Sequence, residues 1–453
     1  KGMLEDGSLA LSGIETIIEN YDSDNFDAQG AQDMMFSLMK ALPEIKTADD
    51  PDMEPYTLDI VTMLKEVLKF ALCAPVTNGI HEYVYTYQTI NGKGELTTAS
   101  ATLYLPQKSL FTRKVPTLVM PHYGDLKRST APSCNIVKGF DYGIEKVEDL
   151  EFVSTLLMEL LARSGYAMIY PDGIVGSNHE AIPMVTKISA YNVIDAILAA
   201  QEIETDFHDA VWDKDDLNII SLSLGAYTAL ETAKVIQTEY SDLLKVKTTA
   251  LVDGPFDISG IMMGEFINNG NTKFYVPSLV FSFDNVFGAY EPGFLYTNAL
   301  RNDIPGFQEG YKNAYNDPKA NEPVRAANNY LEETLGVDYI DQTQALSQEF
   351  IEGIQNSTSN LQKCLKTCDA FYNWVPEMPV MFFHNPGDPT VIVENSYKAV
   401  EEFRKAGCTN VGVTLFPEYL EQIYFHGGAC VVGMFKAFKW IDRQVYGKRF
   451  VNQ

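Results

Sequence analysis

Apolar and polar positions alternate in two stretches of the chain, residues 83–90 and 97–105. Alternation with a period of two is typical of β-strands that bury one face. Between the two stretches lies Asn91-Gly-Lys-Gly94, a sequence typical of a tight turn. This turn lacks the third glycine and the following helix of a phosphate-binding loop. The pattern therefore predicts an antiparallel hairpin.

Further along, short and almost wholly apolar runs alternate with stretches of helical periodicity. Runs of this kind are typical of strands buried on both faces, as in a parallel sheet covered by helices. The sequence therefore predicts a doubly wound α/β domain: a mostly parallel sheet preceded by antiparallel strands. The predicted strands are 117–121, 167–171, 217–222, 248–252, 380–384 and 411–416, and the clearest helices are 152–162, 188–200 and 431–441.

The spacing of these runs divides the chain. Between Gly254 and Met378 lie 123 residues, whereas a plain crossover needs only about a dozen. We therefore predict an α/β core over 81–256 and 377–453, with a mainly helical cap subdomain, 257–376, inserted. Residues 1–55 carry 13 acidic and 3 basic residues, and we expect residues 1–80 to form an acidic, partly helical extension.

Charge excludes some partners. The 453 residues include 34 basic and 61 acidic side chains, giving a net charge of −27, which opposes binding to phosphate backbones. No apolar stretch approaches the ~18 residues of a membrane-spanning helix. We expect no nucleic-acid partner and no membrane span. Since the sequence starts at Lys1, we expect a secreted or periplasmic protein from which a targeting segment has been removed.

The strongest chemical signal is Ser223, in Asn218-Ile-Ile-Ser-Leu-Ser223-Leu-Gly225. A buried strand here runs through small residues into a predicted helix, the context in which a sharp turn exposes a nucleophilic serine. Ser221 stands where the usual pattern has its first glycine. The alternative is a strand that ends in serine by chance.

A serine nucleophile needs a histidine base and a carboxylate that orients it, which follow in this order in many hydrolases. Asp388 lies in a Pro-Gly turn after the strand 380–384, and His426 follows the last predicted strand in what we expect to be a loop. The alternative for Asp388 is an aspartate that caps its own turn. The alternative for His426 is a structural histidine. We predict the triad Ser223, Asp388 and His426.

Backbone amides must hold the oxyanion, one after the nucleophile and one after an earlier strand. Leu224 supplies the first, and Tyr123 or Gly124, in Pro121-His-Tyr-Gly-Asp125, the second. We find no zinc-protease motif, P-loop or dinucleotide fingerprint, so we expect no metal and no cofactor. The acid-rich stretch 202–216 is predicted to be a solvated face.

These residues resemble the α/β-hydrolase superfamily over about 83–446, and within it the secretory lipases of the fungal lipase A type and their bacterial relatives. The likeness rests on the hairpin end Thr98–Pro106, on His122-Tyr-Gly124, on Tyr170-Pro-Asp-Gly-Ile-Val-Gly176 and on the order of Ser223, Asp388 and His426. The resemblance implies a cap over the active site, an acyl-serine intermediate and ester hydrolysis without a cofactor.

The leading hypothesis is therefore a serine hydrolase of the carboxylesterase or lipase kind that acts on a small-molecule ester or lipid. Aromatic residues of the cap, together with one histidine, are candidates for the substrate pocket, although ordinary packing explains aromatic rings equally well. One alternative is a prolyl oligopeptidase-like serine peptidase, and another is a non-catalytic binding protein with the same fold. The pocket candidates are His122, Phe281, Phe283 and Phe287.

Overall fold

A computed structural model describes most of the chain from Ile80 onward. The described residues are 80–106, 114–123, 131–135, 150–173, 185–203, 212–268, 275–289, 291, 293–294, 304–315, 317, 323–335, 346–416 and 426–447. The predicted extension 1–80 lies outside them, apart from its last residue, so its expected helices stay a prediction.

The sheet has eight strands in the order β1-β2-β4-β3-β5-β6-β7-β8. The first two form the predicted hairpin, and β2 pairs antiparallel with β4, whereas every other neighbouring pair is parallel. The predicted fold class is confirmed. The strands are β1 Ile80–Ile90, β2 Leu96–Pro106, β3 Val115–Val119, β4 Ala167–Pro171, β5 Trp212–Leu222, β6 Val246–Val252, β7 Val380–His384 and β8 Val411–Leu415.

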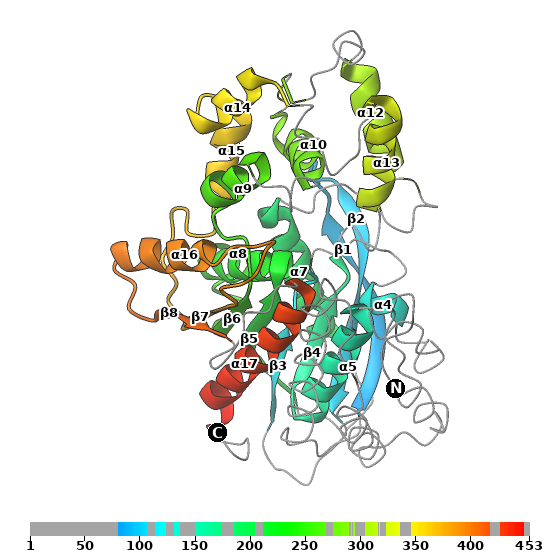
Figure 1. The fold of residues 1–453 in the computed structure, drawn as a ribbon. Helices are drawn as coiled ribbons and strands as arrows, with labels where there is room; N and C mark the ends of the chain where they lie inside the picture. The colour runs from blue at the N-terminus through cyan, green and yellow to red at the C-terminus, as the bar shows by residue number, and fades with distance from the viewer. Residues whose placement is uncertain are drawn as a thin grey trace, which may run out of the picture.

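Helices cover both faces of this sheet (Figure 1). Successive side chains of a strand point to opposite faces, so Val119 and Ile219 face one layer of core while Leu118 and Ile220 face the other. On the first face lie α7 Thr186–Glu202, α8 Ser223–Glu239 and α16 Glu394–Lys405, and on the second lie α5 Leu150–Arg163 and α17 His426–Tyr446. A short helix, α4 Pro132–Asn135, precedes α5.

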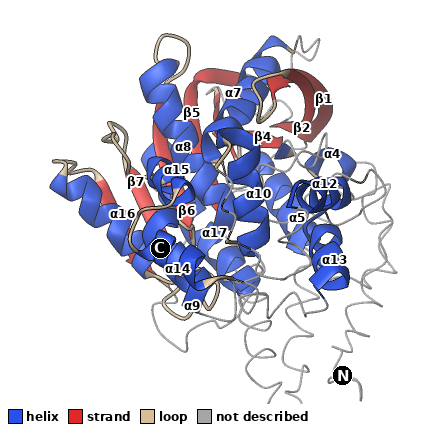
Figure 2. Ribbon diagram, turned by 90° about the horizontal axis from the view of Figure 1, so that it is seen from above, coloured by secondary structure: helices blue, strands red, loops and turns tan. Residues whose placement is uncertain are grey.

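The described residues between β6 and β7 are mainly helical, as predicted for the cap segment. These helices gather beyond one end of the sheet (Figures 1 and 2). The division of the chain at 256 and 377 stays a prediction. The segment contains η5 Ile258–Met262, a π-helical turn, and then α9 Met263–Asn268, α10 Tyr275–Phe287, α12 Ile304–Tyr315, α13 Pro323–Leu335, α14 Gln348–Gln355 and α15 Asn360–Cys368.

Two local expectations were wrong. Strand β5 begins at Trp212, five residues before the predicted start, and a register shift between Pro116 and Thr117 of β3 accommodates the extra residues. Part of the acid-rich stretch thus belongs to a strand, with its acidic residues kept outside the buried core. Helix α17 begins at His426, so this histidine is the first residue of a helix, whereas the sequence predicted that it lies in a loop. None of the described helices is long and apolar enough to cross a membrane.

The hairpin carries an acidic side chain whose protonation should show in the stability of the fold. Burial raises the pKa of Glu82 on β1 to about 7, and the nearby Glu159 acts in the same direction. A carboxyl group with a raised pKa stabilises the folded state below its ordinary pKa of 4.5, and this stabilisation is lost as the pH rises through about 7.

We expect Glu82→Gln to match the wild type in free energy of unfolding at pH 4.5 and to exceed it by about 1 kcal/mol at pH 8. The difference stays this small because water screens the partly exposed Glu82 carboxylate. The glutamine keeps an acceptor for the Tyr104 hydroxyl, which hydrogen-bonds Glu82. Urea denaturation at several pH values measures the difference, and a difference that does not change with pH would contradict the assignment.

Candidate active site

Ser223 occupies the sharp turn between β5 and α8, at the carboxyl end of a central strand of the sheet. Its φ angle is +51°, a left-handed backbone conformation that is costly for a residue with a side chain and that is typically kept at functional turns. Leu222 before it is still extended, and Ser223 is the first residue of the helix. The backbone therefore turns at the serine, as the pattern of small residues predicts.

Gly225 allows this turn to pack against the neighbouring strand end. A Cβ atom at this position would lie 2.6 Å from the carbonyl oxygen of Pro121, 2.9 Å from that of His122 and 2.3 Å from Ser221 Oγ. Two of these three atoms belong to the backbone and cannot rotate away. The turn after β5 and the loop after β3 therefore come into contact at Gly225, where a side chain would not fit.

We expect Gly225→Ala to lower the free energy of unfolding by about 2–3 kcal/mol and to lower ester hydrolysis strongly, because the loop after β3 must move to make room. Gly264→Ala is the matched control, since no heavy atom lies within 4 Å of its Cβ position; we expect little change. Denaturant midpoints and turnover rates measure both, and equal behaviour of the two variants would contradict the close contact.

His426 links the serine to a buried carboxylate. Its Nε2 lies 2.8 Å from Ser223 Oγ and its Nδ1 lies 2.5 Å from Asp388 Oδ2. These contacts join residues 203 and 38 positions apart in the sequence. The structure thus brings together all three residues of the predicted triad, in the geometry in which a histidine can accept the serine proton while an aspartate fixes its tautomer.

The turn after β7 holds Asp388 in place. Its Oδ1 accepts the backbone N–H groups of Thr390, at 2.8 Å, and Val391, at 3.0 Å. Burial acts to raise the pKa of Asp388, but the neighbouring His426 and the backbone N–H groups outweigh it, so that the pKa is lowered. Asp388 is therefore an anion that can stabilise a charged imidazole.

A second buried aspartate lies beside it. Asp253 follows β6 with a φ of +45°, and its Oδ1 accepts the backbone N–H of Asn385 at 2.8 Å. Burial and the nearby Asp388 carboxylate raise the pKa of Asp253 well above its usual range. These opposite shifts favour the ionised form of Asp388 and the protonated form of Asp253. The sequence motifs did not identify Asp253, although its place directly after a buried strand is the same signal that identified Asp388.

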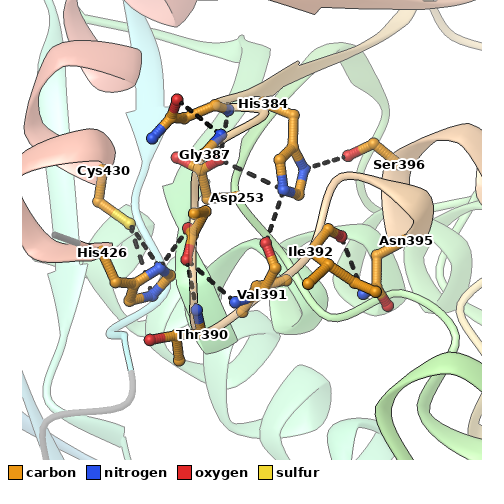
Figure 3. Close-up of polar contacts among 12 residues, drawn as sticks. Asp253, His384, Gly387, Thr390, Val391, Ile392, Asn395, Ser396, His426 and Cys430 are labelled. Carbon is orange, nitrogen blue, oxygen red and sulfur yellow. Dashed lines mark hydrogen bonds and ion pairs between the residues drawn. The ribbon is translucent and has the colours of Figure 1, made fainter. Parts of the chain in front are cut away.

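His384 completes this cluster without being available for proton transfer (Figure 3). Its Nε2 lies 2.8 Å from the carbonyl oxygen of Val391, and its Nδ1 lies 2.7 Å from Ser396 Oγ. Since a carbonyl can only accept, Nε2 carries the proton and Nδ1 accepts from the serine hydroxyl. Burial lowers the pKa of His384 to about 4. The neutral His384 ring therefore links β7 to α16 and has a structural role.

The same cluster is the only group of potential metal ligands within the described part of the chain. Asp253, His384 and Asp388 each offer an atom within 4.8 Å of the others. Both ring nitrogens of His384 already have partners, and both oxygens of Asp388 accept hydrogen bonds. A divalent cation would have to displace these bonds and the contact with His426, so this donor set does not fit a metal site.

Cys430, one helical turn after His426, was also missed. Its Sγ lies 3.7 Å from His426 Nε2, and the backbone N–H of Ser223 points to the same sulfur. Burial raises the pKa of the thiol well above its usual range, so it is a neutral side chain that packs against the imidazole. A small residue one turn after the histidine is the only sequence signal for it.

The predicted oxyanion residues differ in how far the structure describes them. Leu224 is the second residue of α8, where a helix leaves its N–H groups unbonded. Tyr123 is buried, and its ring stacks on that of His122, with centroids 4.6 Å apart. Gly124 lies outside the described residues. The loop that contains Tyr123 lies against Gly225, the residue after Leu224, and the role of the two amides stays a prediction.

The aromatic residues of α10 differ among themselves. Phe281 and Phe283 are fully buried, and the Phe281 ring stacks on Tyr311 of α12 with centroids 4.0 Å apart. Phe287, at the end of the helix, is 44% exposed. The contacts of Phe281 are those of ordinary packing between helices, whereas Phe287 has a free face.

A serine on the strained turn after a central strand of a mostly parallel sheet, in contact with a histidine near the last strand, defines the α/β-hydrolase class of serine hydrolases. The chain belongs to the secretory lipase family, whose family model matches residues 149–453. It is therefore an ester-hydrolysing enzyme, and its substrate is a small-molecule ester or lipid. No curated protein sequence matches the chain.

Solved structures share the fold at low sequence identity. The rice cell wall degrading esterase LipA from Xanthomonas oryzae is 18% identical, with a TM-score of 0.60 over 83% of this chain and 91% of the esterase. A putative hydrolase from Legionella pneumophila is 19% identical, with a TM-score of 0.61 over 84% and 96%. Lipase A from Candida antarctica is 16% identical, with a TM-score of 0.50 over 77% and 74%. The expected resemblance to lipase A and bacterial relatives is confirmed.

Proposed function

We propose that Ser223 is the nucleophile, His426 the general base and Asp388 the carboxylate that orients it. The observation that carries this proposal is the unbroken series of contacts, 2.8 Å from Ser223 Oγ to His426 Nε2 and 2.5 Å from His426 Nδ1 to Asp388 Oδ2. The strained backbone at Ser223 and the ionised state of Asp388 support it. Without this series, the fold would serve a binding protein equally well.

The reaction follows from these positions. Ser223 Oγ attacks the ester carbonyl as His426 Nε2 takes its proton, and the carbonyl oxygen becomes an oxyanion. The backbone N–H of Leu224 and an N–H of the Tyr123–Gly124 loop donate hydrogen bonds to it. The C–O bond to the alcohol then breaks, His426 protonates the alcohol, and an acyl-serine remains. Water, deprotonated by His426, releases the acid and restores Ser223.

We further propose where the acyl chain lies and where the enzyme acts. The exposed face of Phe287 and the stacked ring of His122 are the candidates for contact with the acyl chain, and the buried Phe281 and Phe283 anchor α10. The description of the family as secretory lipases supports action outside the cytoplasm, after removal of a targeting segment.

A series of nitrophenyl esters, from acetate to palmitate, tests the substrate class, with a peptide anilide as the comparison. We expect a burst of nitrophenol equal to the enzyme concentration, followed by slower turnover, because nitrophenol leaves readily and hydrolysis of the acyl-serine is then the slow step. The intact mass of the enzyme in quenched samples should be increased by the mass of one acyl group. Cleavage of the anilide without ester turnover would overturn the proposal in favour of a peptidase, and binding without turnover would favour a non-catalytic protein.

A further inference from the structure

Ser221 is a buried hydroxyl in the strand that carries the nucleophile, at the position where the usual pattern has glycine. Its side chain is fully buried, and its Oγ donates a hydrogen bond of 2.6 Å to the carbonyl oxygen of Pro121. Pro121 lies just beyond β3, at the start of the loop that contains Tyr123. The bond therefore connects the nucleophile strand with the loop after β3, across 100 residues of sequence.

This contact lies in the most crowded part of the site. The position of a Cβ atom on Gly225 is 2.3 Å from Ser221 Oγ and 2.6 Å from the Pro121 carbonyl oxygen. The Ser221 hydroxyl, the Pro121 carbonyl and the first turn of α8 thus meet at Gly225. Ser221 lies two residues before Ser223, and Gly225 lies two residues after it. A change at Ser221 therefore acts directly on the loop after β3.

The bond also sets the direction of an amide. In a trans peptide the C=O and the following N–H point in opposite directions, so fixing the Pro121 carbonyl fixes the His122 N–H. The next residues are held by the contact of His122 Nδ1 with the Tyr123 carbonyl oxygen, at 2.9 Å, and by the stacking of their rings. Beyond the loop, the His122 ring also stacks on Tyr170 of β4, with centroids 5.6 Å apart.

We propose that Ser221 is a positioning residue for ester hydrolysis: its hydroxyl holds the loop of residues 121–123 at the distance from Ser223 that lets the loop amides meet the oxyanion. The proposal rests on the proposed function, in which these amides stabilise the oxyanion. With glycine at 221, as in the usual pattern, the Pro121 carbonyl would lack this donor. Here the serine supplies in its side chain a restraint on the loop that the usual pattern does not include.

Ser221→Ala tests this role, because it removes the donor and leaves the backbone of β5 able to keep its conformation. Hydrogen bonds to the oxyanion matter in the transition state and not in the ground state. We therefore expect kcat to fall roughly tenfold or more while KM changes less than about twofold. Affinity for n-butylboronic acid, whose serine adduct is tetrahedral, should fall in parallel with kcat/KM.

Ser164→Ala is the matched control. Ser164 is equally buried, and its Oγ donates a bond of 2.7 Å to the carbonyl oxygen of Leu161 at the end of α5. It should lose comparable stability and keep its kcat and boronate affinity. Ser221→Gly provides a second variant that adds no atom to the crowded turn and should show the same kinetic loss. All rates are divided by the concentration of enzyme that a fluorophosphonate labels, so that unfolded protein does not contribute.

An unchanged kcat in both Ser221 variants would overturn the proposal, because the Ser221 hydroxyl would then contribute only to packing. A loss of boronate affinity in Ser164→Ala equal to that in Ser221→Ala would overturn it as well, because the effect would then follow stability alone. Failure of the proposed function is distinguishable from both results: the wild-type enzyme itself would show no fluorophosphonate adduct on Ser223.

Discussion

Ser223→Ala should lower kcat for nitrophenyl esters by about 10⁴-fold or more and leave the fold intact. The alanine removes the only atom of the residue that can attack the ester, whereas the remaining contact between His426 Nδ1 and Asp388 Oδ2, at 2.5 Å, does not depend on the serine. Steady-state kinetics, with thermal unfolding measured on the same samples, checks both parts of the expectation.

Ser282→Ala is the control for this variant. Its Oγ is fully buried and donates to the carbonyl oxygen of Ser278, at 2.6 Å, within α10. We expect its kcat to stay within a few-fold of the wild type. If Ser223→Ala retained turnover of the same order as Ser282→Ala, the nucleophile would have to be another group.

Asp388→Asn should lower kcat by about 10³- to 10⁴-fold. The asparagine oxygen can still accept the N–H groups of Thr390 and Val391, which then turns the NH₂ group toward His426 Nδ1. A nitrogen that faces a donor must present its lone pair, so the ring proton moves to Nε2. The Nε2 atom, 2.8 Å from Ser223 Oγ, can then no longer accept the serine proton.

Asp253→Asn is the matched control, because the two aspartates lie in one buried cluster. Burial and Asp388 raise the pKa of Asp253 well above its usual range. This favours its neutral form, which an amide resembles in charge and shape. We expect kcat within a few-fold of the wild type. Equal losses in the two variants, measured by kcat at pH 7, would mean that the carboxylates act as one unit.

Much of the fold could be predicted from the sequence because its strands carry distinct patterns. The run of residues 380–384 coincides with β7, and the run 167–171 coincides with β4. The early part of β5 could not be predicted, since Asp213, Asp215 and Asp216 are unfavourable in strands and are tolerated only in the part of β5 outside the core. The start of α17 was missed because two glycines follow His426.

The three residues of the triad could also be predicted from the sequence, whereas their buried neighbours could not. Ser223, Asp388 and His426 could be chosen from the sequence since each follows a strand, in the order that the fold requires. Asp253 also follows a strand directly, but its nearness to the Asp388 carboxyl group, 135 positions away, is not visible in the sequence. Cys430 could not be chosen, because its contact with the imidazole one helical turn before it appears only in the fold. The bond of Ser221 to Pro121 likewise depends on two strands becoming neighbours.

The nucleophile is the centre of this account, and covalent labelling tests it most directly. A fluorophosphonate reacts with a serine only when a base has activated it. We expect one adduct per chain in the intact mass, located on Ser223 by peptide mapping and lost in Ser223→Ala. An adduct on another serine, or none on folded protein, would contradict the account.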